Sequence, residues 1–240
     1  MATERDHRNE IVRVGNLLHS SGMVAATDGN ISVRLGHNRI LATPTGMSKG
    51  LMSRGDLVVV DLKGRRISGK RNVSSEIGMH LLIYRMRPDV NAIVHAHPTT
   101  ATGFAAAGIA LDKPLCSEMI ITLGSVPLAC YGTPGTAELW ASLEPLIPYH
   151  CAILMANHGV VTYGDDLQRA YMCMETVEHF AKITLVTHLL GRQALLNDEQ
   201  VSKLRQAGEQ YVLGTRNGSA RARALSDFQQ AEPAAARKRK

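Results

Sequence analysis

The stretch AIVHAHP, residues 92–98, joins an aliphatic run to two histidines and a terminating proline. The aliphatic residues predict a buried strand over residues 91–97, which Pro98 ends because proline has no N–H for a strand ladder. Side chains two residues apart in a strand share a face, with Cα atoms about 7 Å apart, so His95 and His97 can converge on one cation. A lone histidine at a strand end is usually only hydrogen-bonded. The pair favours a metal site.

A second buried strand is predicted over residues 152–156, and it leads into Asn157-His158-Gly159. Gly159 permits a close approach of neighbouring groups or an unusual backbone angle. Taken alone, this stretch is equally well explained as a core strand followed by an incidental histidine. Together with His95 and His97 it supplies a third imidazole. Three nitrogen ligands with one open coordination position are typical of a catalytic zinc site, whereas structural zinc sites more often use cysteines.

Predicted helices and strands alternate along the chain, which indicates the α/β class. We expect helices over residues 5–19, 74–88, 99–107, 136–146, 165–190 and 197–213. We expect further strands over residues 31–34, 40–42, 57–61, 120–122 and 126–131. No linker or internal repeat is visible, so residues 1–215 are predicted to form one domain. Residues 216–240 are rich in alanine and basic residues and are predicted to be a disordered tail.

Composition excludes several classes of protein. The net charge of +6 arises mainly from the tail, which holds seven basic and two acidic residues and leaves 20 basic and 19 acidic residues for the rest. A nearly neutral body argues against a specific nucleic-acid partner. No apolar run reaches the ~20 residues of a membrane span, and the charged N-terminus lacks the apolar segment of a secretory signal. The four cysteines have no CxxC spacing and are interpreted as reduced thiols. Reduced thiols and the lack of a secretory signal together predict a cytoplasmic protein.

Three short polar segments are candidates for binding an anion. Ser74-Ser75-Glu76 stands at a predicted helix start, where serines ordinarily cap and glutamate ordinarily interacts with the helix dipole. The same exposed N–H groups can bind a phosphate. The loops Gly29-Asn30 and Thr45-Gly46 are small enough to cradle a phosphate with backbone N–H groups. None of these segments is specific alone. The remaining histidines show no ligand spacing: His7, His19, His37, His80, His150, His179 and His188. His179 and His188, on the long predicted helix, are interpreted as structural.

Taken in order, these segments resemble the class II aldolase/adducin family, especially its aldolases of the L-fuculose-1-phosphate type. The resemblance is carried by residues 28–33, 43–46, 74–76, 95–97 and 157–159, and it extends from about residue 10 to 213. It implies a three-layer α/β/α sandwich around a central mixed, largely antiparallel sheet. It also implies a homotetramer with active sites between neighbouring subunits.

The resemblance further implies a role for each matching residue. His95, His97 and His158 would ligate one Zn²⁺ per subunit, and Glu76 would be the catalytic acid/base and an additional metal ligand when no substrate is bound. Tyr211 would help to move protons, whereas the family's other proton-transferring tyrosine is missing from residues 114–118. The residues that would hold the substrate phosphate are Gly29, Asn30, Thr45, Gly46, Ser74 and Ser75.

The implied reaction is the cleavage of a phosphorylated sugar, a ketose 1-phosphate, to dihydroxyacetone phosphate and an aldehyde. The candidate substrates are L-fuculose 1-phosphate and a 5-deoxy- or methylthio-substituted pentulose 1-phosphate. Two alternatives use the same scaffold: a pentulose-phosphate 4-epimerase, a type with aspartate in place of Glu76, and a methylthioribulose-phosphate dehydratase. An alternative from another class is a non-catalytic, adducin-like interaction module, but such modules lack the metal-binding histidines that this sequence contains.

Overall fold

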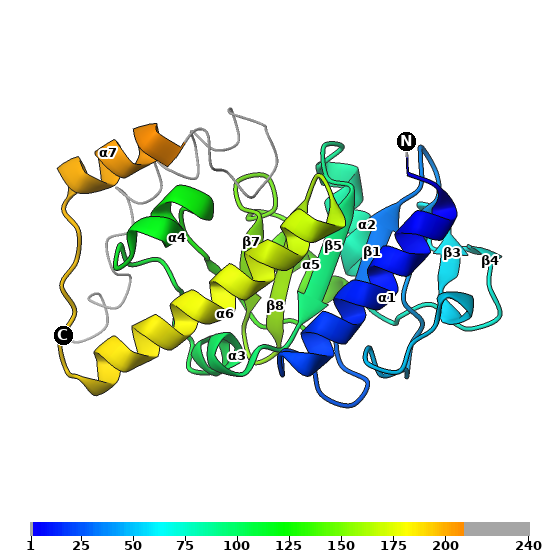
Figure 1. Cartoon of the computed structure of the whole chain (residues 1–240), viewed down its shortest axis with the longest axis horizontal. Coiled ribbons are helices and arrows are strands. Elements are labelled where there is room, and N and C mark those ends of the chain that lie inside the picture. Colours follow the sequence, from blue (N-terminus) through cyan, green and yellow to red (C-terminus); the bar gives the residue numbers. More distant parts are fainter. Residues whose placement is uncertain (1, 209–240) are drawn as a thin grey trace.

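A computed structural model describes residues 2–208 of the chain (Figure 1). Its strands are β1 (Asn30–Arg34), β2 (Ile40–Ala42), β3 (Val58–Val60), β4 (Arg66–Ser68), β5 (Ala92–Ala96), β6 (Leu128–Ala129), β7 (Ala152–Met155) and β8 (Gly159–Gly164). Within these residues they form one eight-stranded sheet in the order β4-β3-β2-β1-β5-β8-β7-β6. Every neighbouring pair is antiparallel except β6 with β7. The mixed, largely antiparallel sheet is therefore confirmed.

Helices cover both faces of this sheet. They are α1 (Glu4–Ser20), α2 (Ile77–Met86), α3 (Thr99–Ala106), α4 (Ser117–Thr122), α5 (Ala137–Leu143), α6 (Leu167–Leu189) and α7 (Asp198–Ala207), with a 3-10 turn η1 (Arg54–Asp56). Helices α1, α3 and α6 lie in front of the sheet in Figure 1, and α2 and α5 lie behind it. No helix among the described residues has both the length and the apolar character needed to cross a bilayer.

The side chains of β5 are buried on both faces of the sheet, which shows why the fold has three layers. Val94 packs into the hydrophobic cluster on the side of α1, α3 and α6, whereas Ile93 packs into the cluster on the side of α2 and α5. Leu154 and Ile153 divide in the same way on β7. Strands that are apolar on both faces need a helical layer on each side. The predicted α/β/α sandwich is confirmed.

The prediction of a strand over residues 120–122 is wrong, because these residues form the end of helix α4. The β-branched run Ile120-Ile121-Thr122 has high intrinsic strand propensity. In the folded chain, however, Met119 and Ile120 bury their side chains in the core, and α4 contacts α6 and α7. Tertiary packing of one face of α4 therefore outweighs the local strand preference of these residues.

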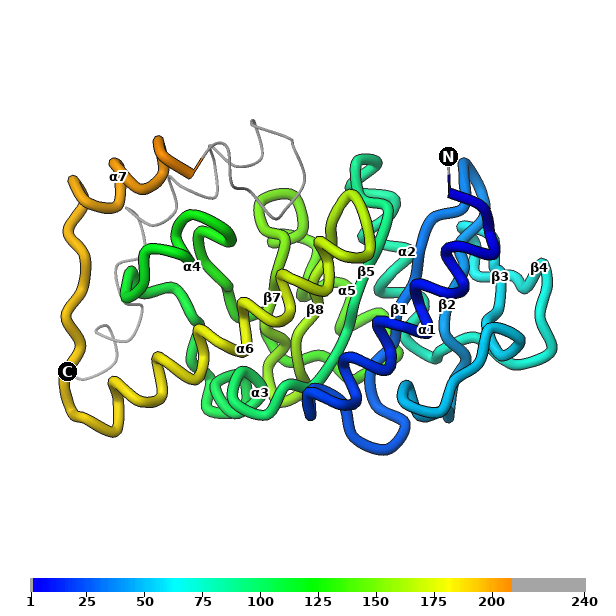
Figure 2. The backbone as a smooth tube through the Cα atoms, in the orientation of Figure 1, coloured from blue at the N-terminus to red at the C-terminus, as the bar shows by residue number. Residues whose placement is uncertain are grey.

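Strand β8 was not predicted, although it is an interior strand of the sheet, between β5 and β7. The chain reverses through Ala156, Asn157 and His158, and Met155 pairs directly with Gly159. Asn157 adopts a left-handed conformation with φ of 56°. Asparagine tolerates this conformation better than most residues, which allows so tight a reversal. Figure 2 shows the β7–β8 hairpin lying behind α6.

The C-terminal predictions are only partly within the described residues. Helix α7 begins after Asn197, whose side chain accepts the N–H of Gln200 at 2.9 Å, as the predicted start requires. The helix ends at Ala207, earlier than the predicted residue 213. Tyr211, the predicted domain boundary at residue 215 and the basic tail lie outside the described residues.

Candidate active site

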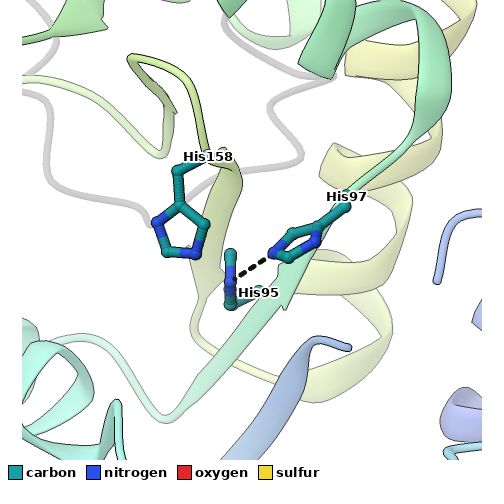
Figure 3. Close-up of side chains that lie close together, drawn as sticks. All are labelled: His95, His97 and His158. Atoms are coloured by element: carbon teal, nitrogen blue, oxygen red, sulfur yellow. Dashed lines mark hydrogen bonds between the residues drawn. The ribbon is translucent and has the colours of Figure 1, made fainter. Parts of the chain in front are cut away.

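Three histidines from two separate parts of the chain lie together at one end of the sheet (Figure 3). His95 is on β5, His97 follows the end of β5, and His158 is in the turn between β7 and β8. Because β5 and β8 are antiparallel neighbours, with Ala96 paired to Val160, the end of one strand lies beside the start of the other. The ring centroids are 4.8 to 5.1 Å apart, and the candidate ligand atoms all lie within 4.8 Å of one another.

For two of the three rings, an outer contact determines which nitrogen faces the centre. His95 donates its Nδ1–H to the carbonyl oxygen of Val160 at 2.8 Å, so its Nε2 points inward. The Nδ1 of His97 lies 3.4 Å from an Asp28 carboxylate oxygen, and its Nε2 lies 3.0 Å from the Nε2 of His95. Metal-binding histidines are oriented in this way by a carbonyl or carboxylate on the second nitrogen. Close approach of the rings requires Gly159, since a methyl group there would lie 2.5 Å from His97 Cδ2.

Glu76 places its carboxylate among these histidines. Its Oε2 lies 3.3 Å from the Nε2 of His95, and its Oε1 lies 3.2 Å from the Nε2 of His158. Asn30 donates an N–H to Oε2 at 2.8 Å. Burial alone would raise the pKa of Glu76, but the neighbouring histidines and Asn30 outweigh it and hold that pKa well below its usual range. The carboxylate is therefore ionised at neutral pH.

The backbone turn just before α2 explains the position of Glu76. The prediction that a serine caps the helix is wrong, because α2 begins at Ile77 and its N-cap residue is Glu76. Ser74 forms the preceding turn: its carbonyl oxygen accepts the N–H of Ile77 at 3.1 Å, and its hydroxyl accepts the N–H of Glu76 at 3.3 Å. The turn directs Glu76 into the protein, where it is 9% exposed, instead of along the solvent side of a first helical turn.

This set of donors fits a divalent cation. Burial, followed by the charge of His95, lowers the pKa of His97 and of His158 to about 4, so both rings are neutral at pH 7. The Nε2 atoms of His95 and His97 lie 3.0 Å apart, beside a buried carboxylate oxygen, Glu76 Oε1, that has no hydrogen bond among residues 2–208. A positive charge between them satisfies all of these groups at once. Nitrogen and oxygen ligands suit several divalent metals, including zinc.

The three predicted anion-binding segments lie side by side near this centre. The N–H of Thr43 bonds to the carbonyl oxygen of Ile31 at 3.0 Å, and the N–H of Ser74 bonds to the carbonyl oxygen of Thr43 at 3.3 Å. Pro44 and Val73 form an antiparallel bridge. These contacts bring together the segments that contain the predicted residues Gly29, Asn30, Thr45, Gly46, Ser74 and Ser75. Their phosphate-binding role remains a prediction.

Two of these residues already have partners. The N–H of Thr45 donates to the carbonyl oxygen of Asn72 at 3.0 Å, so a phosphate contact from Thr45 would use its exposed hydroxyl. Asn30 donates to Glu76 and accepts from His80, so its side chain holds the Glu76 carboxylate in addition to any contact with substrate.

Sequence reasoning missed two buried polar groups at this site. His80, which showed no ligand spacing, is not part of the histidine cluster but bonds to Asn30 at 2.5 Å. The sequence did contain one signal that His80 lies near Glu76: the two are four residues apart, and residues at i and i+4 share a face of a helix. Lys49 is 1% exposed and donates to the carbonyl oxygens of Thr27 and Met47 at 2.8 and 2.6 Å. Burial lowers the pKa of Lys49 to about 8, although the negative charges of Asp28 and Glu76 act to raise it.

Gly29 is expected to tolerate no side chain. Its φ is 70°, and a methyl group there would lie 2.6 Å from the carbonyl oxygen of His95 and 2.8 Å from Val24 Cγ1. Gly46 is a matched control, because its φ is 66° but nothing lies within 4 Å of the added carbon. We expect Gly46→Ala to destabilise the fold by about 1–2 kcal/mol through backbone strain alone. Gly29→Ala should cost about 1–3 kcal/mol more through overpacking, as measured by chemical unfolding. Equal losses for the two variants would contradict the close packing of Gly29 against β5.

Comparison with known proteins places the chain in a family. The model of the class II aldolase and adducin N-terminal domain matches residues 9–185, so the chain belongs to that family. A 5-deoxy-D-ribulose 1-phosphate aldolase of Bacillus thuringiensis serovar kurstaki is 36% identical over 207 residues, which cover 85% of this chain and 96% of the relative. A 3-oxo-tetronate 4-phosphate decarboxylase of Pectobacterium atrosepticum is 36% identical over 191 residues, covering 78% and 87%.

A solved structure of an L-fuculose 1-phosphate aldolase has a TM-score of 0.79 and 32% identity, and the alignment covers 86% of this chain and 97% of that one. These relatives are lyases, and this chain is a lyase of the same metal-dependent family. The expectation of an enzyme is confirmed, and the alternative of a non-catalytic module finds no support. The relatives differ in substrate and in reaction.

Proposed function

We propose that the chain is a zinc-dependent aldolase that cleaves a ketose 1-phosphate to dihydroxyacetone phosphate and an aldehyde. The observation that carries this proposal is the convergence of three imidazoles and the Glu76 carboxylate beside three adjoining polar loops. Candidate substrates are L-fuculose 1-phosphate and a 5-deoxy- or methylthio-pentulose 1-phosphate. Similarity to a 5-deoxy-D-ribulose 1-phosphate aldolase favours the deoxypentulose phosphate.

The chemistry needs a group that exchanges a proton at carbon. Breaking the C3–C4 bond leaves an electron pair at C3, while the C4 hydroxyl loses its proton and becomes the aldehyde. A divalent cation held by His95, His97 and His158 supplies, when bound, positive charge beside the carbonyl oxygen that takes up those electrons. Glu76 is the residue that delivers the proton to C3 and removes it in the reverse direction. Its Oε1 has no hydrogen bond within residues 2–208, so this oxygen is free to carry that proton.

The polar loops would fix the substrate by its phosphate. Backbone N–H and hydroxyl groups at Gly29, Thr45, Gly46, Ser74 and Ser75 are suited to phosphate oxygens. The ammonium group of Lys49 lies behind these loops and joins two of them through the carbonyl oxygens of Thr27 and Met47. A phosphate bound there would hold C3 at a constant distance from Glu76, and such positioning is a large part of catalysis.

A second candidate is decarboxylation of a 3-oxo-acid 4-phosphate, supported by the relative with that activity. Aldol cleavage needs a base for the C4 hydroxyl proton, whereas a leaving carboxylate departs as carbon dioxide without one. The tyrosine that the family resemblance leads us to expect within residues 114–118 is missing, and Glu118 is exposed on α4. The absence of this base is more easily reconciled with decarboxylation. The Glu76 proton transfer is the same in both reactions.

Analysis of products separates these candidates and the two earlier alternatives. We would supply the zinc-loaded enzyme with 5-deoxyribulose 1-phosphate, L-fuculose 1-phosphate and 3-oxo-tetronate 4-phosphate in separate reactions. The expected result is dihydroxyacetone phosphate with an equimolar aldehyde from one of the sugar phosphates. Release of carbon dioxide from the oxo-acid alone would establish the decarboxylase instead. An epimer or loss of water, seen by NMR with pentulose phosphates, would indicate the epimerase or the dehydratase.

We also propose that the enzyme is a homotetramer. Large apolar side chains are exposed at the end of α6, among them Leu185, Val186, Leu189 and Leu190. A contiguous apolar patch of this kind supports a subunit contact. Sedimentation of the full-length chain would measure the oligomeric state directly, and a monomer at micromolar concentration would contradict the proposal.

A further inference from the structure

A chain of buried hydrogen bonds reaches Glu76 from the apolar core. Tyr84 OH lies 2.9 Å from Ser32 Oγ, and Ser32 Oγ lies 2.6 Å from His80 Nδ1. His80 Nε2 lies 2.5 Å from Asn30 Oδ1, and Asn30 Nδ2 lies 2.8 Å from Glu76 Oε2. The first four residues are each less than 5% exposed. They come from two elements that are distant in sequence, since Ser32 and Asn30 are on β1 while His80 and Tyr84 are on α2.

Only one arrangement of protons satisfies this chain. The ionised carboxylate of Glu76 can only accept, so Asn30 must turn its amide N–H₂ toward it and its carbonyl oxygen toward His80. His80 must then donate from Nε2, which leaves its Nδ1 as an acceptor. Ser32 therefore donates to Nδ1 and accepts from Tyr84. Every donor in the chain points toward Glu76.

The ring of His80 must be neutral in this arrangement. It is completely enclosed, and an isolated charge there would be costly to desolvate. Burial, together with the charge of His95, lowers the pKa of His80 to about 3. Burial likewise raises the pKa of Tyr84 above its usual range, which keeps its hydroxyl proton available to Ser32.

We propose that His80 is a positioning residue of the enzyme: by donating from Nε2 to Asn30, it fixes the amide that holds Glu76 Oε2 and leaves Oε1 as the oxygen that faces the substrate. The proposal deepens the proposed function and rests on it for the role of Glu76. Without the donor at residue 80, the buried Asn30 carbonyl oxygen loses its partner, and the Glu76 carboxylate alone holds the amide in this orientation. In the reversed orientation its carbonyl oxygen would face the carboxylate and repel it. The two carboxylate oxygens would then no longer have fixed, separate roles.

The test compares variants of His80 in the metal-loaded full-length enzyme. His80→Leu removes the donor while keeping an apolar group of similar bulk, and His80→Gln keeps an N–H₂ group at the distance of Nε2. We expect His80→Leu to lower kcat about 10- to 100-fold, the range found for residues that orient catalytic groups. Because the phosphate loops are untouched, KM should change less than about threefold. Metal content per subunit should equal that of the wild type, and His80→Gln should regain most of kcat.

His179→Leu is the matched control, because His179 is exposed on α6 and far from Glu76 in sequence. It should leave kcat, KM and metal content unchanged. A folded, metal-loaded His80→Leu enzyme with wild-type kcat would overturn the proposal. So would equal losses of kcat and metal in both His80 variants, since these would indicate a merely structural role.

A measurement on the wild type keeps the proposal open to refutation if the His80 variants fail to fold. NMR of protein labelled with ¹⁵N in its histidines distinguishes the two neutral tautomers from the charged ring. At pH 7 we expect His80 to carry its proton on Nε2 alone. A proton on Nδ1, or on both nitrogens, would overturn the proposal. If the wild type turns over none of the candidate substrates, the proposed function fails, whereas the tautomer measurement still decides the arrangement at His80.

Discussion

Replacing Glu76 with glutamine is expected to leave a folded, metal-loaded protein that has lost most of its turnover. Glutamine keeps the shape of the side chain, and its carbonyl oxygen can accept the N–H that Asn30 donates at 2.8 Å. It cannot take up or deliver a proton at neutral pH. Positioned acid–base groups contribute about 10²- to 10⁴-fold to rates, so we expect kcat to fall by that factor. The measurement is the initial rate of dihydroxyacetone phosphate release.

The control for this variant is Glu144→Gln, which removes an exposed carboxylate after α5. It should have wild-type activity. Metal content distinguishes the possible causes of a loss in Glu76→Gln, because the three histidines remain and should still hold the ion. Wild-type turnover in Glu76→Gln would remove Glu76 from the proton-transfer role. Loss of metal together with activity would show that its carboxylate is mainly a ligand.

Replacing His97 with asparagine is expected to abolish stable metal binding. His97 is the most exposed of the three rings, with 24% of its side chain accessible, so its removal disturbs packing least. Changing even an outer partner of a ligand typically weakens metal binding 10–100-fold, so loss of a ligand should weaken it at least about 100-fold. We expect the purified variant to retain little metal and to lose activity. Metal analysis after dialysis against a mild chelator measures this directly.

Thermal unfolding gives an independent measurement of the same site. A ligand present at 100 times its Kd stabilises the folded state by about 2.7 kcal/mol. Added zinc should therefore raise the Tm of the wild type but not that of His97→Asn. His37→Asn, a change in the exposed turn between β1 and β2, should respond as the wild type does. A zinc-induced rise in Tm of equal size in His97→Asn would exclude His97 from the metal site.

Most of the metal centre could be predicted from sequence because strand geometry is local. The alternation of side chains along residues 92–97 places His95 and His97 within reach of one another wherever the strand lies in the fold. The apolar run before His158 indicated a second strand that ends in a histidine. What the sequence did not reveal is that β8 returns beside β5, which is the pairing that brings His158 to the other two rings.

The surroundings of Glu76 were less predictable. The sequence placed it in a first helical turn behind a serine cap, but the chain turns at Ser74 and leaves Glu76 as the N-cap residue itself. Asn30 was expected to contact phosphate, which stays a prediction, but nothing in the sequence indicated that its amide also bonds to Glu76 and His80. The burial of Lys49 left no signal in the sequence. Each of these depends on which side chain from a distant segment fills the neighbouring space.

By itself, the sequence predicted the α/β class and the three candidate metal-binding histidines, because residue type and the period of a strand or helix are properties of a short segment. Its resemblance to the family added Glu76 as the candidate acid/base. The tertiary structure decided that residues 120–122 are helical, that β8 lies between β5 and β7 and that His80 reaches Glu76 through Asn30. These outcomes follow from packing and hydrogen bonding between segments that are distant in sequence, such as those of Asn30 and His80, which are 50 residues apart. Such long-range contacts satisfy buried polar groups only in the folded chain, so no local pattern encodes them.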